Sequence, residues 1–167
     1  MNWGRELEAK IPGAPDFKYK ELIKSDTAIR KGIVNCPNEI QWQHLERMAQ
    51  TILQPVREEF GPLRVTSAFR CPELCLAIGS TAKSTHTFGW AADFEPFYST
   101  DVRLFTILEW VFENLEFDTL IAEYFPEGWI HCTYAGSPER KRHRLKLKDP
   151  THNYDLVSMG NMRQLYG

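Results

Sequence analysis

Apolar side chains recur at helical spacing between residues 39 and 60. They fall three or four residues apart, at Ile40, Leu45, Met48, Ile52, Leu53 and Val56, and this predicts a helix with one buried face. Pro55 is expected to kink or end the helix, because proline lacks the backbone N–H that a helix interior uses. A second repeat over 99–115 starts with capping residues and predicts another helix, buried at Leu104, Ile107, Leu108, Val111, Phe112 and Leu115.

Shorter runs have the alternation or composition of strands. Residues 63–69 are rich in β-branched side chains, and the proline that follows fits the first turn of a short helix ending near Gly79. In 89–95, Asp93 falls on the opposite face from Trp90, Ala92 and Phe94. The runs 117–124 and 129–134 are joined by "FPEG", whose proline and glycine favour a turn, so a hairpin is predicted.

The two ends of the chain have weaker patterns. Residues 1–38 are mixed and contain several prolines, which predicts a wrapping arm of short turns and loops. From residue 135 the chain is polar and basic, and the alternation of Leu145 and Leu147 predicts an edge strand before an irregular tail. No repeat or linker divides the 167 residues, so we expect one domain, 1–167, with a single core.

Composition narrows the classes of function. The formal charge of −2 gives no general attraction to nucleic acid or anionic lipid. No apolar run approaches the roughly 20 residues of a membrane span, and the first ten residues lack the apolar core of a signal peptide. We therefore expect no membrane span, and a chain that is cytoplasmic at synthesis. The four cysteines are too few and scattered for a disulfide scaffold, and we expect free thiols.

One local basic run, 139–148, allows a rival hypothesis of a nucleic-acid-binding or structural protein. It contains Arg140, Lys141, Arg142, Arg144, Lys146 and Lys148. A solvated basic face is the commoner explanation of such a run, so our prediction is that nucleic acid is not a partner. Nucleic-acid binding would weaken steeply as ionic strength rises.

Three residues could form a metal site. A catalytic zinc takes three nitrogen or oxygen ligands and keeps one position for water, and His86, Asp93 and His131 offer such a set. The helical HExxH arrangement is absent. Spacing alone is a weak signal, because a lone histidine is more often a structural or surface group. That structural explanation is preferred for the three remaining histidines, His44, His143 and His152.

The stretch "RVTSAFRCPELCLAIGSTAKSTHTFGWAADFE", followed by "FDTLIAEYFPEGWIHCTY", resembles the zinc D-alanyl-D-alanine carboxypeptidase family. That family includes phage and bacterial peptidoglycan endopeptidases and shares its zinc fold with the Hedgehog signalling domain. The resemblance runs from about Ser25 to Tyr134. It is carried by the pattern Ser-x-His-x-x-Gly-x-Ala-x-Asp, then Trp-x-His, found here as Ser84, His86, Gly89, Ala91, Asp93, Trp129 and His131. The resemblance implies that His86, Asp93 and His131 bind Zn²⁺.

The resemblance also implies a fold and a substrate. The fold would be α+β, a small and mainly antiparallel sheet with helices packed on one face and a zinc cleft on the other. Arg70 would bind a free carboxylate of a peptidoglycan stem peptide, and Ser84 and Trp129 would also contact the substrate. The chain departs from the family beside the cleft, at Ala68, Phe69, Cys75, Ile78 and Thr85. These differences bear on substrate preference more than on metal binding.

Glu123 is the favoured candidate for the general base, and Glu127 is the alternative. Glu123 matches the glutamate of the phage-type pattern "fDxLIxE", while Glu127 lies in the turn, and Gly128 excludes a carboxylate three residues before the last ligand. Strand parity does not decide: a four-residue loop points Glu123 away from His131, and a five-residue loop or a bulge returns it to the metal face. Asp118 is a candidate to orient a ligand histidine through a hydrogen bond, or else an exposed strand-end residue.

The predicted function is that of a zinc peptidase that hydrolyses a peptide bond in peptidoglycan stem peptides, as a D,D-carboxypeptidase or an endopeptidase. Its setting would be phage or bacterial cell-wall lysis or remodelling, as a free lysin or with other phage structural proteins. The alternative is an inactive zinc-binding or virion structural module on the same fold. The sequence leaves open which bond is cleaved, the target organism and the oligomeric state.

Overall fold

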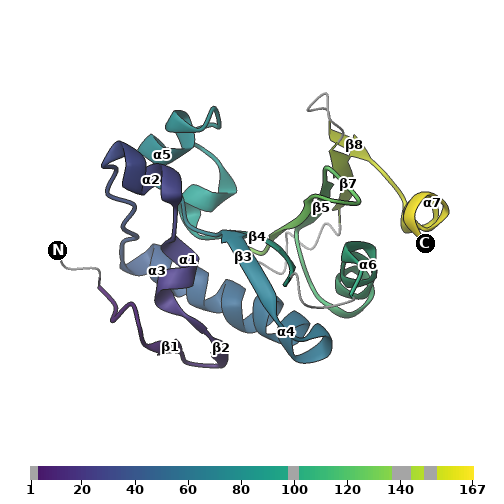
Figure 1. Ribbon diagram of the computed structural model, residues 1–167, viewed down its shortest axis with the longest axis horizontal. Helices are drawn as coiled ribbons and strands as arrows, with labels where there is room; N and C mark the ends of the chain where they lie inside the picture. Colours follow the sequence, from purple (N-terminus) through teal and green to yellow (C-terminus); the bar gives the residue numbers. More distant parts are fainter. Residues whose placement is uncertain (1–3, 98–101, 137–143, 149–153) are drawn as a thin grey trace.

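A six-stranded sheet crosses the molecule, which the computed structural model describes for residues 4–97, 102–136, 144–148 and 154–167. Its strands lie in the order β3 (Leu63–Ser67), β4 (Ala91–Pro96), β6 (Trp129–Thr133), β5 (Thr119–Glu123), β7 (Arg144–Lys148) and β8 (Tyr154–Leu156). Figure 1 shows β3 and β4 in the middle of the molecule, with β5, β7 and β8 to their right. Neighbouring strands are antiparallel except β5 and β7, which are parallel. The predicted α+β class with a mainly antiparallel sheet is confirmed.

A long helical segment packs under one face of the sheet. It consists of α3 (Glu39–Met48), a π-helical stretch (Ala49–Leu53) and α4 (Gln54–Phe60), which follow one another without a break. Pro55 therefore does not end the helix. The π-helical stretch ends at Leu53, and Pro55 lies in the first turn of α4, a position where proline is tolerated.

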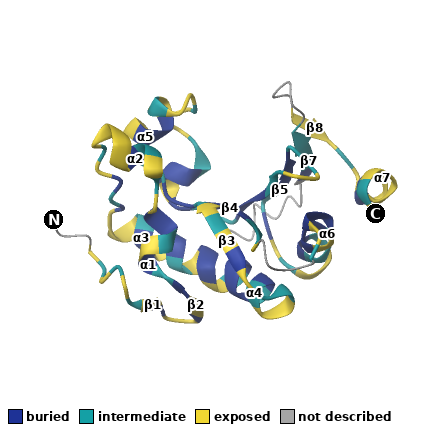
Figure 2. Ribbon diagram, in the orientation of Figure 1, coloured by how far each residue is buried: buried dark blue, intermediate teal, exposed yellow. Residues whose placement is uncertain are grey.

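The core lies between this face and the helices. Alternate strand residues point into it, namely Ala92, Phe94, Leu120, Ala122, Ile130, Cys132 and Leu145, and all are buried. The helices α3, α4 and α6 (Leu104–Asn114) supply further buried residues, and Figure 2 colours the buried segments of the ribbon dark blue. Ile40, expected on the buried face, is 63% exposed, and Trp42 is buried in its place. The capping residues predicted at 99–101 lie outside the described residues, and α6 has Arg103 at its N-cap.

The N-terminal arm has more regular structure than expected. It forms a small antiparallel sheet, β1 (Lys10–Ile11) with β2 (Ala14–Lys18), and two short helices, α1 (Tyr19–Ile23) and α2 (Asp26–Lys31). Ile11, Phe17 and Leu22 from the arm are buried in the core. The short helix predicted at Pro72 is found as α5 (Pro72–Ala77), with the proline in its first turn.

The C-terminal segment differs from its prediction in two ways. The strand at Leu145 is present, but it is not at an edge, because β8 pairs with its outer side. The expected irregular tail is wrong for the last residues, which form α7 (Met159–Tyr166). The helix is fixed by tertiary contacts: Met159 and Met162 are buried in the core, and Arg163 forms ion pairs with two glutamates of α6.

Two further expectations can be compared with the structure. All four cysteines are free thiols, as predicted, and Cys75 and Cys132 are buried. Among the described residues, no helix has both the length and the apolar character needed to cross a membrane.

Candidate metal centre

His86 lies on a 3₁₀ helix (Thr85–Phe88), and the flanking motif residues explain its local structure. Ser84 caps this helix by accepting a hydrogen bond from the His86 backbone N–H at 3.4 Å. Gly89 ends it with a φ of 75°, where a Cβ would stand 2.7 Å from the Gln41 carbonyl oxygen. The Ser-x-His-x-x-Gly part of the pattern thus forms a capped turn that fixes the position of the histidine.

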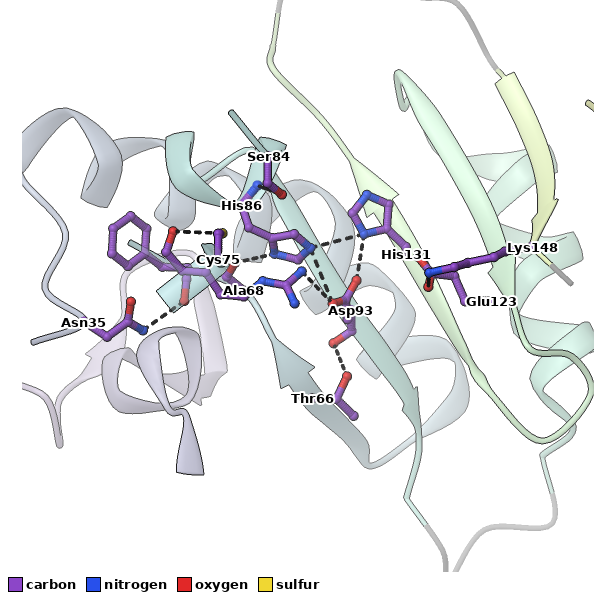
Figure 3. Close-up of polar contacts among 12 residues, drawn as sticks. Asn35, Thr66, Ala68, Cys75, Ser84, His86, Asp93, Glu123, His131 and Lys148 are labelled. Carbon is purple, nitrogen blue, oxygen red and sulfur yellow. Dashed lines mark hydrogen bonds and ion pairs between the residues drawn. The ribbon is translucent and has the colours of Figure 1, made fainter. Parts of the chain in front are cut away.

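Asp93 and His131 are directly opposite each other in the sheet. β4 and β6 pair them in register, so both side chains leave the face that points away from the core. Asp93 Oδ1 lies 2.7 Å from His131 Nδ1, while His86 Nε2 lies 3.4 Å from Asp93 Oδ2 and 3.3 Å from His131 Nδ1. Figure 3 shows the three side chains converging from the turn and the two strands.

The three donors fit a tetrahedral zinc. Ligand atoms bound at 2.0–2.1 Å in tetrahedral geometry lie about 3.3 Å apart, and the separations observed here are 2.7–3.4 Å. His86 Nδ1 lies 2.5 Å from the Ala68 carbonyl oxygen. An N–H at Nδ1 donates to that oxygen, and Nε2 then has its lone pair free for a metal.

Electrostatics favours the protonation states that bind a cation. Burial lowers the pKa of His86, against the opposing effect of Asp93, so the imidazole stays neutral. Burial opposes ionisation of Asp93, but the two histidines outweigh it and hold the pKa of the carboxyl below its usual value. The anionic Asp93 carboxylate and the neutral His86 imidazole lie together with His131 in a cluster that could hold a metal ion.

The cluster lies in a cleft of about 690 Å³. One side of the cleft comes from Arg70 and the segment 78–86, and the other from strands β5 to β8. Arg70, Ser84 and Trp129, the residues expected to contact substrate, all line it. Arg70 places one guanidinium nitrogen 3.3 Å from Asp93 Oδ2. Its Nε and the Trp129 Nε1 are buried, with no hydrogen-bond partner among the described residues.

The loop of the predicted hairpin determines where Glu123 points. Glu123 pairs with Trp129, which leaves a five-residue loop, and Ile121 pairs with His131. Glu123 therefore shares the face of the metal cluster and lines the cleft. Its side chain is 9% exposed and is paired with Lys148.

The structure places Glu127 elsewhere. This side chain is exposed and does not line the cleft of the metal cluster. It borders a separate surface pocket with Pro126 and Gly128. Of the two glutamates left open by the sequence, only Glu123 lies in the cleft.

Asp118 does not reach either histidine. Its carboxylate accepts a hydrogen bond from the Ala135 N–H at 2.7 Å, beyond the end of β6. The group that orients a histidine is instead the Ala68 carbonyl. Asp118 is thus a structural strand-end residue rather than the orienting group considered from the sequence.

Sequence reasoning missed the residues that support the cleft from outside the motifs. Asn35 is buried and binds the backbone of Ile23, Phe69 and Cys71 at 2.8–3.0 Å, which fixes the segment that carries Ala68 and Arg70. Its place in "IVNCPN" was the only signal, and that pattern says nothing about what its amide contacts.

Lys148 and Tyr154 also line the cleft. The sequence predicts a solvated basic face that includes Lys148, and the structure contradicts this for Lys148, since its side chain is only 16% exposed.

The cleft contains two histidines and an aspartate, with a further carboxylate nearby. These are the types of residue that bind zinc and assist it in hydrolases. A family model described as peptidase M15 matches residues 15–133, more than half of the chain. The chain therefore belongs to the peptidase M15 family of zinc peptidases, and the resemblance found in the sequence is confirmed. No curated protein matches the chain. Family membership makes it a metallopeptidase, and the His-Asp-His cluster is its candidate metal centre.

Proposed function

We propose that the protein is a zinc-dependent peptidase that hydrolyses a peptide bond in the stem peptides of peptidoglycan. The observation that carries the proposal is the cluster of His86, Asp93 and His131 in a cleft also lined by Glu123. Family membership supports peptidase chemistry on this substrate class. The setting that we propose is the lysis or remodelling of a bacterial cell wall, by a phage or by a bacterium.

His86 Nε2, His131 Nδ1 and one oxygen of Asp93 would hold the zinc ion. When bound, zinc polarises the scissile carbonyl and lowers the pKa of a coordinated water toward about 7. The chain supplies the fixed orientation of its donors, through the Ala68 carbonyl at His86 and the sheet register at Asp93 and His131.

Glu123 is the general base in this proposal. It lines the same cleft as the metal cluster and lies on the same face of the sheet. Its carboxylate takes a proton from the attacking water and returns it to the leaving amine, so that the amine departs neutral. Such a positioned proton-transfer group contributes typically 10²–10⁴-fold to the rate.

Arg70, Ser84 and Trp129 bind the substrate in this proposal. The Arg70 guanidinium binds a free carboxylate of the stem peptide, since charge-assisted hydrogen bonds of this kind are strong and directional. Ser84 and Trp129 line opposite sides of the same cleft, where they can contact the peptide backbone. The bond that is cleaved, at a free carboxyl terminus or within a cross-link, follows from where that carboxylate lies relative to the metal.

The proposal is tested by incubating the zinc-loaded protein with purified peptidoglycan and identifying the released fragments by mass spectrometry. Wild-type protein should release peptides or amino acids, and their masses identify the bond. Glu123→Gln should keep its zinc and its fold, because glutamine is nearly isosteric, and lose roughly 10²–10⁴-fold in kcat.

Glu127→Gln is the matched control, because this glutamate is exposed and lies outside the cleft. It should retain wild-type activity. Zinc-loaded protein that releases nothing from any peptidoglycan tested would refute the proposal in favour of a zinc-binding structural module. Equal loss of activity in both glutamine variants would remove Glu123 from its role.

A further inference from the structure

Lys148 contacts Glu123 inside the cleft. Its ammonium lies 3.0 Å from Glu123 Oε2, and the two side chains are 16% and 9% exposed. The rings of Tyr124 and Tyr154 approach the same ammonium, with centroids 5.1 and 5.0 Å away. Figure 3 shows this pair beside His131. The lysine is thus held by a carboxylate and two aromatic rings instead of extending into solvent.

The pair is set by the backbone. β5 and β7 run parallel with Glu123 opposite Lys148, and the Lys148 carbonyl accepts a hydrogen bond from the Tyr124 N–H at 3.1 Å. Both residues therefore leave the same face of the sheet. Burial opposes the charge of Lys148, but its contacts with Tyr154 and Glu123 outweigh burial and raise the pKa of its ammonium.

Lys148 and Tyr154 lie beyond the part of the chain that the family model matches, which ends at residue 133. The C-terminal strands β7 and β8 nevertheless complete the wall of the cleft beside Glu123. This wall is therefore formed by a segment that follows the matched residues and that carries its own charged group to the site.

The contact leaves one oxygen of Glu123 available. Lys148 binds Oε2, and Oε1 makes no hydrogen bond to any residue in the described parts of the chain. A glutamate side chain has several rotatable bonds, and an ion pair in a half-buried position restricts them. Because a misplacement of about 1 Å can cost on the order of 10²-fold in rate, such a restriction matters to a general base.

We propose that Lys148 is a positioning residue, which holds Glu123 by Oε2 so that Oε1 is free to take the proton of the attacking water. This inference rests on the proposed function, because it assigns Lys148 a role in the same reaction. The residue does not touch the substrate in this role and acts only through Glu123.

A double-mutant cycle tests it, with Lys148→Met, Glu123→Gln and the double variant assayed on peptidoglycan fragments. Lys148→Met should lower kcat by about 10- to 100-fold, with KM and zinc stoichiometry nearly unchanged. Lys148→Arg should restore most of kcat. The double variant should be no slower than Glu123→Gln alone, because Lys148 has no effect once its partner is gone. Lys146→Met is the control, since this lysine lies on the same strand and contacts Tyr154 but not Glu123.

Multiplied losses in the double variant, or a Lys148→Met effect on KM alone, would overturn the inference and make Lys148 an independent substrate contact. An NMR measurement that needs no catalytic turnover distinguishes failure of this inference from failure of the proposed function. The ammonium signal of Lys148 in ¹⁵N NMR, assigned with Lys148→Arg, should shift in Glu123→Gln. A signal unaffected by that change excludes the pair. A pair seen in an inactive wild-type protein would refute the peptidase function and leave Lys148 a structural partner.

Discussion

Gly128 ends the loop that turns Glu123 toward the metal cluster, and adding a single methyl group there should impair catalysis. A Cβ on this residue would stand 1.7 Å from the Glu123 carbonyl oxygen and 2.9 Å from the Tyr124 carbonyl carbon. Side chains do not approach closer than 3.0 Å, so the backbone would have to move by about 1.3 Å at the residue that carries the proposed base. The clash is with backbone atoms and cannot be relieved by a change of rotamer.

Gly128→Ala is therefore expected to cost about 1–3 kcal/mol of stability, the usual cost of overpacking. At this chain length each kcal/mol lowers Tm by roughly 2–4 °C. A displacement of this size should also lower kcat/KM by about 10²-fold. His131 is held independently by the pairing of β6 with β4, so zinc stoichiometry should stay at one per chain.

Gly160→Ala is the matched control for this experiment. A Cβ at Gly160 in α7 would meet only the Ser158 hydroxyl at 3.6 Å, an ordinary contact. Alanine also favours a helix over glycine by about 1 kcal/mol, so this variant should be as active as wild type and at least as stable. Thermal unfolding, zinc analysis and kinetics on peptidoglycan fragments measure the three effects. Wild-type Tm and kcat/KM in Gly128→Ala would refute the reasoning, because the loop would then tolerate a side chain that the structure excludes.

Two further outcomes are expected. Arg70→Ala should raise KM for a substrate with a free carboxylate by about 10- to 150-fold, the loss of a charge-assisted hydrogen bond of roughly 1.5–3 kcal/mol. Unchanged kinetics with unchanged zinc content would remove Arg70 from the site. The metal-free protein should lose stability as pH falls below about 6.5, by up to about 1.4 kcal/mol per pH unit from His86. The sign follows because burial lowers the pKa of His86 in the folded protein, while the unfolded chain binds the proton near its ordinary pKa. Urea unfolding at pH 7.5 and 5.5 measures this, and His86→Gln should flatten the dependence. If the unfolding free energy of the wild type and of His86→Gln depended equally on pH, the assignment of this effect to His86 would be contradicted.

Local patterns in the sequence were enough to predict most elements of the central sheet and its helices. Phe94 and Ala92 face the core while Asp93 faces the cleft, as the alternation predicted, because side chains of a strand leave opposite faces. The same patterns did not predict the last helix, and of the two outcomes expected at Pro55 the end of the helix is not found. The docking of α7 on α6 is a long-range contact, which a local pattern does not encode.

The sequence by itself placed His86 and Asp93 near each other, since both lie within the ten residues from Ser84 to Asp93 and the turn at His86 is a local structure. His131 joins them through the register of β4 with β6. The sequence also named both candidate bases. Only the tertiary structure showed which of them lies in the cleft, because the length of a hairpin loop sets which face a strand residue points to, and one residue reverses it. Likewise, only the parallel pairing of β7 with β5 joined Lys148 to Glu123, two residues 25 positions apart whose contact depends on sheet register. A period in the sequence specifies the face of a strand, but long-range register is fixed by the packing of the whole sheet.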